Sequence, residues 1–435
     1  MKEVKVVIGK NFGDEGKGAM VHRLCAGKRA IVVRHNGGAQ AGHTVEEGDF
    51  RFVFHQLGSG SLAGCPTFWS KTFLPDLLKL DEEVEGFGAE IGRATSGQTR
   101  AEGFSENRSE QRGGIMCPPK IYAHPDCACT IIYDVLLNSL VETLRGSEKH
   151  GSCGMGIYEA TMRVKEEAYT FRLKEFAVGN VPDIVEKMRR IRQEYTLPRL
   201  QKLQEEYGGA FDSPQVMQWI ELIEDENVLW NVAEQMWENF HKYVVLQDWQ
   251  WVKDSYDTIV FENAQGLMLD RDNVEYYPNL TPSHTGLHNV AELLTEKEKD
   301  SVWTQDETDK PTSDSSLEIY YVTRAYVTRH GMGRLDYECS KEAINPHMMD
   351  KTNVPNCCQD ELRYAKHPSG EAFWKYLRKD LLHLEKIKGF KKRKTVIYVN
   401  HLDETQGNIL FADGAMDLEE FANACEKQGI AMMHR

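Results

Sequence analysis

Short apolar, β-branched segments of this chain repeatedly run into glycine-rich polar loops. The runs are "VKVVIG" (4–9), "AIVVRHNGG" (30–38) and "YDTIVFENAQG" (256–266). Such continuous apolar runs are typical of strands buried in a parallel sheet. Helical spacing in "AMVHRLCAG" (19–27) gives the order strand, loop, helix, strand. The pattern predicts an α/β protein, and because ligands bind at the carboxyl ends of parallel strands, it predicts one composite site there.

We therefore expect a large, mostly parallel central sheet flanked by helices, within a single domain spanning 1–435. Residues 182–250 are expected to form a mainly helical inserted region, and "TIIYDVLLNSLVETLRG" (130–146) has the apolar periodicity and closing glycine of a helix. The polar, acidic stretch 292–317 predicts a solvated, flexible insertion. "KTVIYVNHLDE" (394–404) is expected to contain the last clear strand.

Charge and composition limit the kinds of binding partner and the cellular compartment that we expect. The formal net charge is −15, which argues against duplex nucleic acid or an anionic membrane as a partner. No apolar run approaches the ~20 residues of a membrane-spanning helix, and no basic-then-apolar leader opens the sequence. Ten scattered cysteines indicate reduced thiols, so we expect a cytoplasmic protein.

The first loop, "IGKNFGDEGKGAM" (8–20), has the ingredients of a phosphate site without a standard motif. It matches neither the Walker A pattern nor G-x-G-x-x-G, yet it offers glycines, a following helix and Lys17. Asp14 suits a Mg²⁺ ligand or a proton acceptor, and the alternative is a helix cap. For Glu15 the cap is the more natural interpretation.

The second loop, "HNGGAQAGHTV" (35–45), places His43 among small residues. A backbone without bulky side chains lets a ligand approach closely. An imidazole there, together with a carboxylate from a similar loop, is a candidate acid–base pair.

Several motifs, in order, resemble the adenylosuccinate synthetase family. They are "GDEGKG" (13–18), "NGGAQAGHT" (36–44), "HQLGSG" (55–60), "GSCGMGI" (151–157), "FENAQGLMLDRD" (261–272), "YPNLTPSHT" (277–285) and "AYVTRHGMG" (325–333). Details in "GSCGMGIYEATMR" and 350–364 resemble a divergent branch that includes viral synthetases making 2-aminoadenylosuccinate from dGMP.

The resemblance implies a two-step ligation. GTP phosphorylates the 6-oxygen of IMP, and the amino group of L-aspartate then displaces the phosphate. Asp14 would take the purine N1 proton and bind Mg²⁺ together with the Gly42 carbonyl. His43 would stabilise the transferring phosphoryl group, while Lys17 would hold the γ-phosphate and Gln265 the 6-oxygen.

The resemblance also implies a wider binding set. Arg163 lies where the family sends an arginine into the partner subunit's site, which implies a homodimer. Asp403 lies where a carboxylate reads guanine N1–H and the 2-amino group, which favours GTP. The full nucleotide- and phosphate-binding set is Gly13, Glu15, Gly16, Gly18, Asn36, Gln40, Thr44, Ser152, Cys153, Arg163, Thr281 and Asp403.

The sequence departs from the family pattern in three places. "TNVPNCCQDELR" replaces the arginine-rich aspartate loop and leaves Thr352, Asn353 and Arg363 as candidates for aspartate binding. The family's C-terminal Gly-Pro-Asp-Arg segment has no counterpart, so ATP stays open as the donor. The dGMP-using branch usually lacks the catalytic aspartate, so Asp14 favours IMP.

Four alternatives stay open. The same chemistry could act on dGMP, GMP or dIMP, or the chain could be a non-catalytic purine nucleotide-binding regulator. A plain GTPase lacks any supporting motif. A zinc site formed by Cys117, His124, Cys127 and Cys129 has suitable ligand types but irregular spacing.

Overall fold

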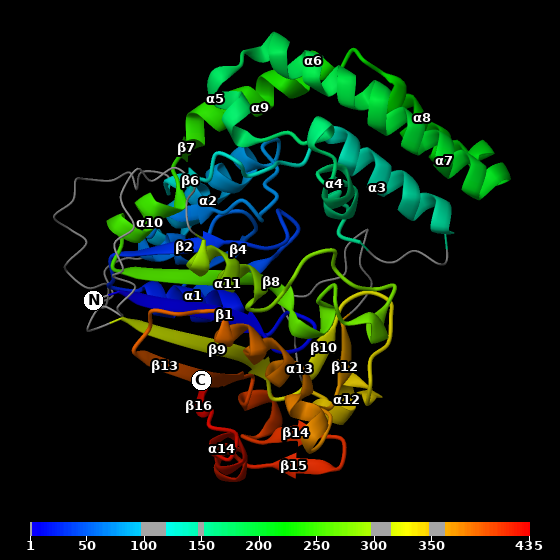
Figure 1. Ribbon diagram of the computed structural model, residues 1–435. Helices are drawn as coiled ribbons and strands as arrows, with labels where there is room; N and C mark the ends of the chain where they lie inside the picture. The colour runs from blue at the N-terminus through cyan, green and yellow to red at the C-terminus, as the bar shows by residue number, and fades with distance from the viewer. Residues whose placement is uncertain (1, 97–118, 147–151, 297–314, 348–361) are drawn as a thin grey trace.

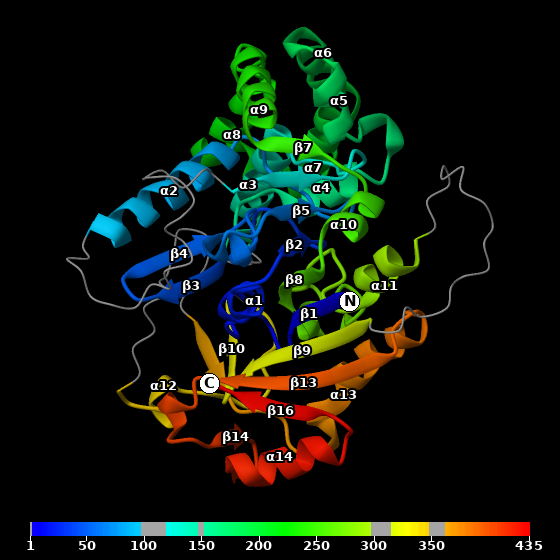
Figure 2. The same ribbon diagram turned by 90° about the vertical axis from the view of Figure 1, so that its left-hand side faces the viewer.

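A nine-stranded sheet forms the centre of the molecule (Figures 1 and 2). The computed structural model describes residues 2–96, 119–146, 152–296, 315–347 and 362–435. Every strand pairing in this sheet is parallel, which confirms the predicted fold class. The strands, in spatial order, are β16 (Ala431–His434), β13 (Lys392–Asn400), β9 (Ser316–Arg324), β1 (Glu3–Gly9), β8 (Thr258–Gly266), β2 (Ala30–Arg34), β5 (Thr67–Trp69), β6 (Ile121–Ala123) and β7 (Val244–Leu246).

The sequence of β1 explains its central position. Val4 and Val6 pack in one apolar cluster, and Val7 packs in a second cluster on the opposite face. Because both faces of the strand are covered, nearly every residue has to be apolar or small. β1 pairs with β8 on one side and with β9 on the other, so its carboxyl end lies in the middle of the sheet edge.

Helices cover both faces of the sheet. α1 (Lys17–Cys25) packs Met20 and Val21 into the cluster that contains Val7. α11 (His288–Thr295) and α13 (Glu371–Leu381) contribute Val290 and Phe373 to the cluster on the opposite face. The arrangement brings the glycine loop between β1 and α1 to the carboxyl edge of the sheet.

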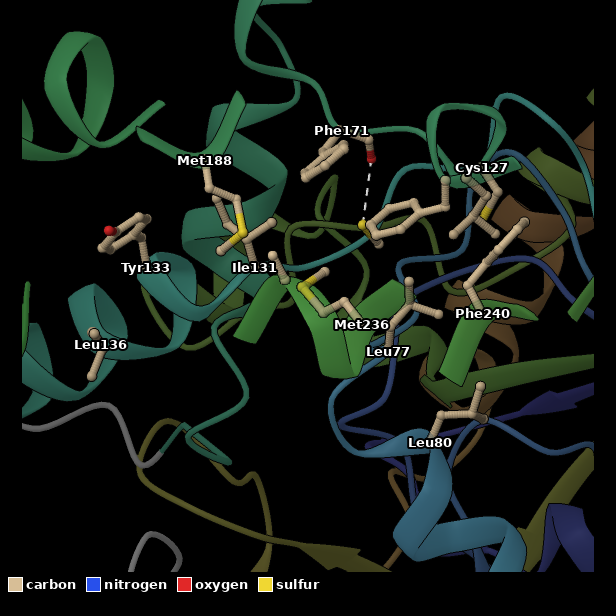
Figure 3. Close-up of a cluster of buried hydrophobic side chains, with 14 of the residues drawn as sticks. Leu77, Leu80, Cys127, Ile131, Tyr133, Leu136, Phe171, Met188, Met236 and Phe240 are labelled. Atoms are coloured by element: carbon tan, nitrogen blue, oxygen red, sulfur yellow. Dashed lines mark hydrogen bonds between the residues drawn. The ribbon is translucent and has the colours of Figure 1, made fainter. Parts of the chain in front are cut away.

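A helical layer packs beside the β5–β6–β7 end of the sheet, at the top of Figure 1. It confirms the predicted helix over 130–146 and the helical character of 182–250. Its apolar side chains, among them Leu136, Met188, Met236 and Phe240, form one core with residues from the sheet region (Figure 3). The layer contains α3 (Ile132–Arg145), α4 (Ile157–Arg163), α5 (Leu173–Val178), α6 (Val181–Ile191), the π-helical turn η5 (Arg192–Thr196), α7 (Leu197–Tyr207), α8 (Pro214–Glu224) and α9 (Leu229–Tyr243).

Three boundary predictions need correction. The helical region ends at Tyr243, because 244–246 form the edge strand β7. The proposed insertion 292–317 begins inside α11 and ends inside β9, and its centre, 297–314, lies outside the described residues. Strand 394–404 is not the last, since three short strands follow it. Three- and four-residue strands are too short to show a periodic pattern.

The remaining elements complete the chain. β3 (His43–Glu47) and β4 (Phe50–Phe54) form a separate antiparallel hairpin outside the central sheet. No helix in the described ranges is long and apolar enough to cross a membrane. The other helices and strands are α2 (Leu80–Ser96), α10 (Trp249–Ser255), β10 (Val327–Arg329), β11 (Glu338–Cys339), α12 (Lys341–Ile344), β12 (Arg363–Ala365), β14 (Ile409–Phe411), β15 (Gly414–Met416) and α14 (Leu418–Glu426).

Candidate functional site

The loop after β1 is held by residues that follow or end three neighbouring strands. The Met268 amide, after β8, donates to the Asn11 carbonyl at 2.9 Å. Arg324 Nε, at the end of β9, donates to the Asp14 carbonyl at 2.6 Å. Asn400 Nδ2, at the end of β13, donates to the Glu15 carbonyl at 2.8 Å. The sheet edge therefore fixes the first glycine loop from several directions.

Glu15 supports this loop from inside. Its carboxylate is buried, accepts hydrogen bonds from the amides of Asn11 (2.9 Å) and Gly13 (3.0 Å), and lies 3.3 Å from Lys17 Nζ. The prediction that Glu15 contacts nucleotide is not supported, because its side chain is already used within the loop. The helix-cap interpretation fails as well, since the N-cap of α1 is Gly16 in a left-handed conformation, φ 86°.

Asp14 occupies a different environment from Glu15. Its side chain is 30% exposed, and the basic side chain that it meets is His330, with Nε2 3.8 Å from Oδ2. The helix-cap alternative for Asp14 is not supported, because the N-cap residue of α1 is Gly16. An accessible carboxylate is a hard oxygen ligand of the kind that Mg²⁺ prefers.

The second loop packs directly against the start of α1. A Cβ atom on Gly18 would lie 2.8 Å from the Thr44 carbonyl oxygen and 3.1 Å from His43 Cβ, so only glycine allows this approach. Gln265 joins the same edge, with its Cα 3.6 Å from the position of a Cβ on Gly13. The structure thus brings together the loops that carry Asp14, His43 and Gln265.

His43 belongs to a buried charged network. Its Nδ1 lies 2.7 Å from Glu262 Oε1 and 2.9 Å from Arg34 Nη1. Because one ring nitrogen cannot both donate and accept, the shorter contact to a carboxylate indicates that Nδ1–H donates to Glu262. Arg34 Nη1 lies 3.4 Å from the other oxygen of Glu262, and Ser59 donates to this carboxylate through its amide and its hydroxyl. Nε2 of His43 is then the nitrogen left for a ligand.

Burial determines the protonation state of this network. It lowers the pKa of His43 to about 4, an effect that Arg34 reinforces and Glu262 opposes. Burial disfavours ionisation of Glu262, but the charges of His43 and Arg34 and the Ser59 hydrogen bond lower its pKa to about 2. In the free protein at neutral pH, His43 is therefore neutral and Glu262 is ionised.

Three buried histidines make stability sensitive to acid. Burial lowers the pKa of His35 and His43 to about 4 and that of His367 to about 3, all below the ordinary 6.5. As pH falls from 6.5 to 4.5, the unfolded chain binds protons that the folded chain does not, so the free energy of unfolding must fall. We expect a loss of about 2–3 kcal/mol per imidazole.

Urea denaturation at pH 7 and pH 4.5 measures this loss. His43→Asn should reduce the difference in stability between the two pH values by about 2–3 kcal/mol, because it removes one such group. Burial raises the pKa of Asp380 to about 7, which acts in the opposite direction in this pH range, so the comparison of variant with parent decides. An unchanged difference in the His43 variant would contradict the assignment of a neutral buried imidazole.

The other predicted nucleotide-binding residues differ in what their side chains contact. The Asn36 amide exchanges two hydrogen bonds with the backbone of Ala264, so Asn36 joins the second loop to β8. Gln40 has a buried Oε1 without a hydrogen-bond partner among the described residues, which suits contact with a ligand. Thr44 lies in β3 against Gly18. Thr281 Oγ1 lies 3.1 Å from Ser283 Oγ.

Ser152 and Cys153 lie in the segment that leads into α4. Ser152 Oγ accepts from Asn138 Nδ2 of α3 at 3.0 Å. Ile157, at the start of α4, reaches the second loop, with Cδ1 2.6 Å from the position of a Cβ on Gly38. The segment therefore borders the second loop without contacting Asp14 through any described hydrogen bond.

Arg163 lies in the core of the single chain. Its guanidinium is fully buried, with Nε and Nη2 bound to Asp134 at 2.9 and 2.7 Å. Its other contacts go to the carbonyls of Tyr169 and Cys129. Four of its five N–H donors are therefore used within the chain in this conformation, and its reach into a partner subunit stays a prediction.

Arg363 is similarly occupied. It contacts both carboxylate oxygens of Glu338, at 2.8 and 2.5 Å, and donates to the carbonyls of Gly331 and Gly333. It is therefore not free for a substrate carboxylate in this conformation. Thr352 and Asn353 lie outside the described residues.

Asp403 lies in an exposed turn after β13. The same strand supplies Asn400, which holds the Glu15 carbonyl. Asp403 thus follows a strand whose carboxyl end supports the first glycine loop.

Sequence reasoning did not assign Glu262, Arg34, Arg324 or His330 to the site. Three of them shared a signal, because Arg34 and Arg324 end β2 and β9 and Glu262 lies near the end of β8. Charged residues inside otherwise apolar buried strands require a partner, and here the partners are one another or the loops.

The zinc alternative is not supported by the described residues. Burial raises the pKa of Cys129 to about 12 and that of Cys127 well above its ordinary value, whereas zinc binds thiolates. Cys127 lies among apolar side chains (Figure 3), and its thiol contacts the Phe73 carbonyl. Cys117 lies outside the described residues.

These features define the class of protein to which the chain belongs. Glycine loops, a helix start and a buried His–Glu pair at the carboxyl edge of a parallel sheet are typical of α/β proteins that handle phosphate-bearing ligands. The family model for adenylosuccinate synthetase matches residues 6–354, and the chain belongs to this family.

Curated relatives agree with this assignment. The adenylosuccinate synthetase of Tolumonas auensis is 27% identical over 296 residues, covering 67% of this chain and 58% of the relative. Those of Psychrobacter cryohalolentis and Yarrowia lipolytica are each 26% identical and cover 75% of this chain and 63% and 64% of their own lengths. The chain thus spans about three-fifths of the length of these relatives.

Two solved structures share the fold. A fully ligated adenylosuccinate synthetase from Plasmodium falciparum superposes with a TM-score of 0.61 at 18% identity, covering 93% of this chain and 79% of that one. The succinoaminodeoxyadenylate synthetase of cyanophage S-2L, bound to dGMP and to dATP as an energy donor, superposes with a TM-score of 0.50 at 13% identity, covering 98% and 99%.

Proposed function

We propose that the protein is a ligase that condenses a 6-oxopurine nucleoside monophosphate, IMP above all, with L-aspartate at the expense of GTP. The observation that carries this proposal is the meeting of two loops at one sheet edge, one with an accessible Asp14 carboxylate and one with His43 held by Glu262. Family membership supports the same chemistry.

The purine oxygen is a poor nucleophile until N1 loses its proton. Asp14 is the accessible carboxylate suited to accept that proton, and Gln265, in a left-handed conformation at the end of β8, can donate its amide to the 6-oxygen. Phosphorylation turns that oxygen into a good leaving group. The aspartate amine then attacks C6, and phosphate departs.

His43 is neutral in the free protein, because burial lowers its pKa to about 4. A triphosphate placed at Nε2 would bring negative charge to the imidazole and raise its pKa, so that Nε2–H donates to the transferring phosphoryl group. Glu262 would stabilise that cation through Nδ1. Lys17, anchored by Glu15 at 3.3 Å, is placed to meet the γ-phosphate.

Mg²⁺ fits the oxygen ligands of this edge, namely the Asp14 carboxylate and the Gly42 carbonyl. When bound, it would neutralise phosphate charge. The Glu15 carboxylate is not one of these ligands, because it accepts hydrogen bonds from the amides of Asn11 and Gly13.

The purine base of the substrate is chosen by the space around Asp14. The viral branch that the sequence resembles usually lacks this aspartate, which would compete with a guanine 2-amino group for space, so we propose IMP before dGMP, GMP or dIMP. The cyanophage synthetase that shares the fold binds dGMP, which keeps dGMP as the second candidate. A nucleotide-binding regulator without turnover is the less favoured alternative. All four residues with proposed catalytic roles, Asp14, Lys17, His43 and Gln265, are present.

Aspartate recognition and assembly remain proposals. Thr352, Asn353 and Arg363 are the candidates for the aspartate carboxylates, and Arg363 would first have to leave Glu338. We also propose a homodimer, in which Arg163 would first have to leave Asp134 to reach the partner subunit.

A substrate screen tests the proposal. The full chain is mixed with Mg²⁺, aspartate and IMP, dIMP, GMP or dGMP, each with GTP or ATP, and products are identified by mass. We expect adenylosuccinate from IMP and GTP. Product only from dGMP would support the second candidate, and nucleotide binding without any product would support the regulator.

Asp403→Asn tests the choice of donor. A carboxylate accepts from guanine N1–H and the 2-amino group together, whereas an amide accepts through one oxygen only. Hydrogen bonds to charged groups contribute about 1.5–3 kcal/mol, so kcat/KM for GTP should fall about 10–100-fold while that for ATP changes little. Asp413→Asn, in the exposed β14–β15 turn, is the control. An unchanged preference for GTP would remove Asp403 from guanine recognition.

A further inference from the structure

Two carboxylates and an imidazole converge at the two ends of the segment 270–284. Asp270 follows the short helix η7 (Leu267–Leu269), and His284 lies before α11. His284 Nδ1 lies 3.5 Å from Asp270 Oδ1 and 3.5 Å from Asp272 Oδ2. One donor atom from each of the three residues lies within 4.8 Å of the others.

These separations match a metal site better than a hydrogen-bonded cluster. A distance of 3.5 Å is long for a nitrogen–oxygen hydrogen bond. A tetrahedral ion with ligands at about 2.0–2.2 Å places its ligand atoms about 3.3–3.6 Å apart. The two oxygens lie at that spacing from the same nitrogen.

The charge of the two carboxylates is also poorly compensated by protein cations. Among the described residues no lysine or arginine forms an ion pair with Asp270, and for Asp272 the nearest is Arg271, 4.0 Å from Oδ1 rather than from the converging Oδ2. Lys379 donates to the backbone carbonyl of Asp272 instead.

Two further imidazoles hold His284 in place. The His288 ring stacks on that of His284 with centroids 3.8 Å apart and planes 19° apart, and His383 contacts His288 edge-on. This stacking fixes the orientation of the His284 ring, as the neighbours of a metal-binding histidine do.

We propose that Asp270, Asp272 and His284 bind a first-row divalent transition metal ion, for which Zn²⁺ is the representative, with water completing the coordination. A nitrogen ligand beside two carboxylates selects such ions over Mg²⁺. The ion would join the ends of the 270–284 segment and thereby fix Thr281 within it. The site is separate from the oxygen ligands at Asp14 and does not depend on the proposed ligation.

Cobalt titration of the full chain tests this site. Co²⁺ replaces Zn²⁺ in such sites and absorbs visible light strongly when four-coordinate. The titration is run with Mg²⁺ in excess, so that hard-cation sites are filled. We expect one equivalent of Co²⁺ to produce the absorption and Zn²⁺ to remove it by competition.

Variants assign the ligands. His284→Ala and Asp272→Asn should each weaken Co²⁺ binding at least about 100-fold, since each loses a direct ligand. His434→Ala and Asp212→Asn are the controls, because both side chains are exposed and lie outside the segment 270–284, and both variants should bind as the parent does. Asp272 is exposed, so Asp272→Asn should fold and still test metal binding even if His284→Ala does not fold. Absence of the absorption in the parent, or unchanged binding in both variants, would overturn the proposal.

Discussion

Asp14→Asn is expected to reduce product formation at least about 10³-fold, because an amide can neither accept the purine N1 proton nor supply an anionic oxygen to Mg²⁺. Asparagine is the informative substitution. Asp14 has φ 60°, and asparagine adopts this left-handed conformation readily, whereas alanine would strain the loop. The backbone contact from Arg324 to the carbonyl of residue 14 is retained in either case.

The experiment separates chemistry from binding and folding. Phosphate release and ligated product are measured together with nucleotide affinity and the thermal midpoint. Asp254→Asn is the control, since Asp254 is exposed on α10, which precedes β8 and so lies toward the opposite edge of the sheet. Turnover of the Asp14 variant within about tenfold of the parent would contradict its role as the base.

The fold was predictable where burial on both faces forces a continuous apolar run. "VKVVIG" has to be buried on both sides, and it forms the central strand β1. The edge strands β7 and β16 were missed, because three or four residues carry no period and their pairing is decided by distant parts of the chain.

The candidate site was predictable where the residue types within one loop indicate a chemical role. Asp14 and His43 stand in glycine loops after strands, and the structure brings those loops together. Glu262 was not assigned, because its partner His43 lies 219 residues away in sequence. The contact between Arg163 and Asp134 of α3 was not predicted for the same reason, because the two residues lie far apart in the sequence.

The structure also separates two adjacent carboxylates that look alike in sequence. Glu15 is buried and accepts hydrogen bonds from the Asn11 and Gly13 amides, whereas the Asp14 side chain is 30% exposed. One of the two acidic residues therefore supports the loop, and the other stays accessible for the role that we propose for it. Glu15→Gln should consequently weaken the loop, whereas Asp14→Asn should spare it.

His43→Asn is expected to lower kcat about 10²–10⁴-fold with nucleotide affinity changed only a few-fold. The asparagine amide can replace Nδ1–H as a donor to Glu262, so the buried carboxylate keeps a partner while the Nε2 position is lost. His35→Gln is the matched control, since His35 is equally buried at this edge but binds Asn263. Unchanged turnover in the His43 variant would remove His43 from the catalytic set.

Glu262→Gln tests whether Glu262 positions and charges His43 or only fills the core. The carboxylate raises the pKa of His43, so its loss should lower that pKa in the nucleotide complex. If the donor form of His43 is required, activity is lost as pH rises through this pKa, and the alkaline limb of the kcat profile should move to lower pH. Loss of the counter-ion to buried Arg34 will also lower stability, by about 3–5 kcal/mol, so the profile is recorded well below the thermal midpoint. A variant that is less stable but keeps the parent's pH profile would show that Glu262 acts on packing alone.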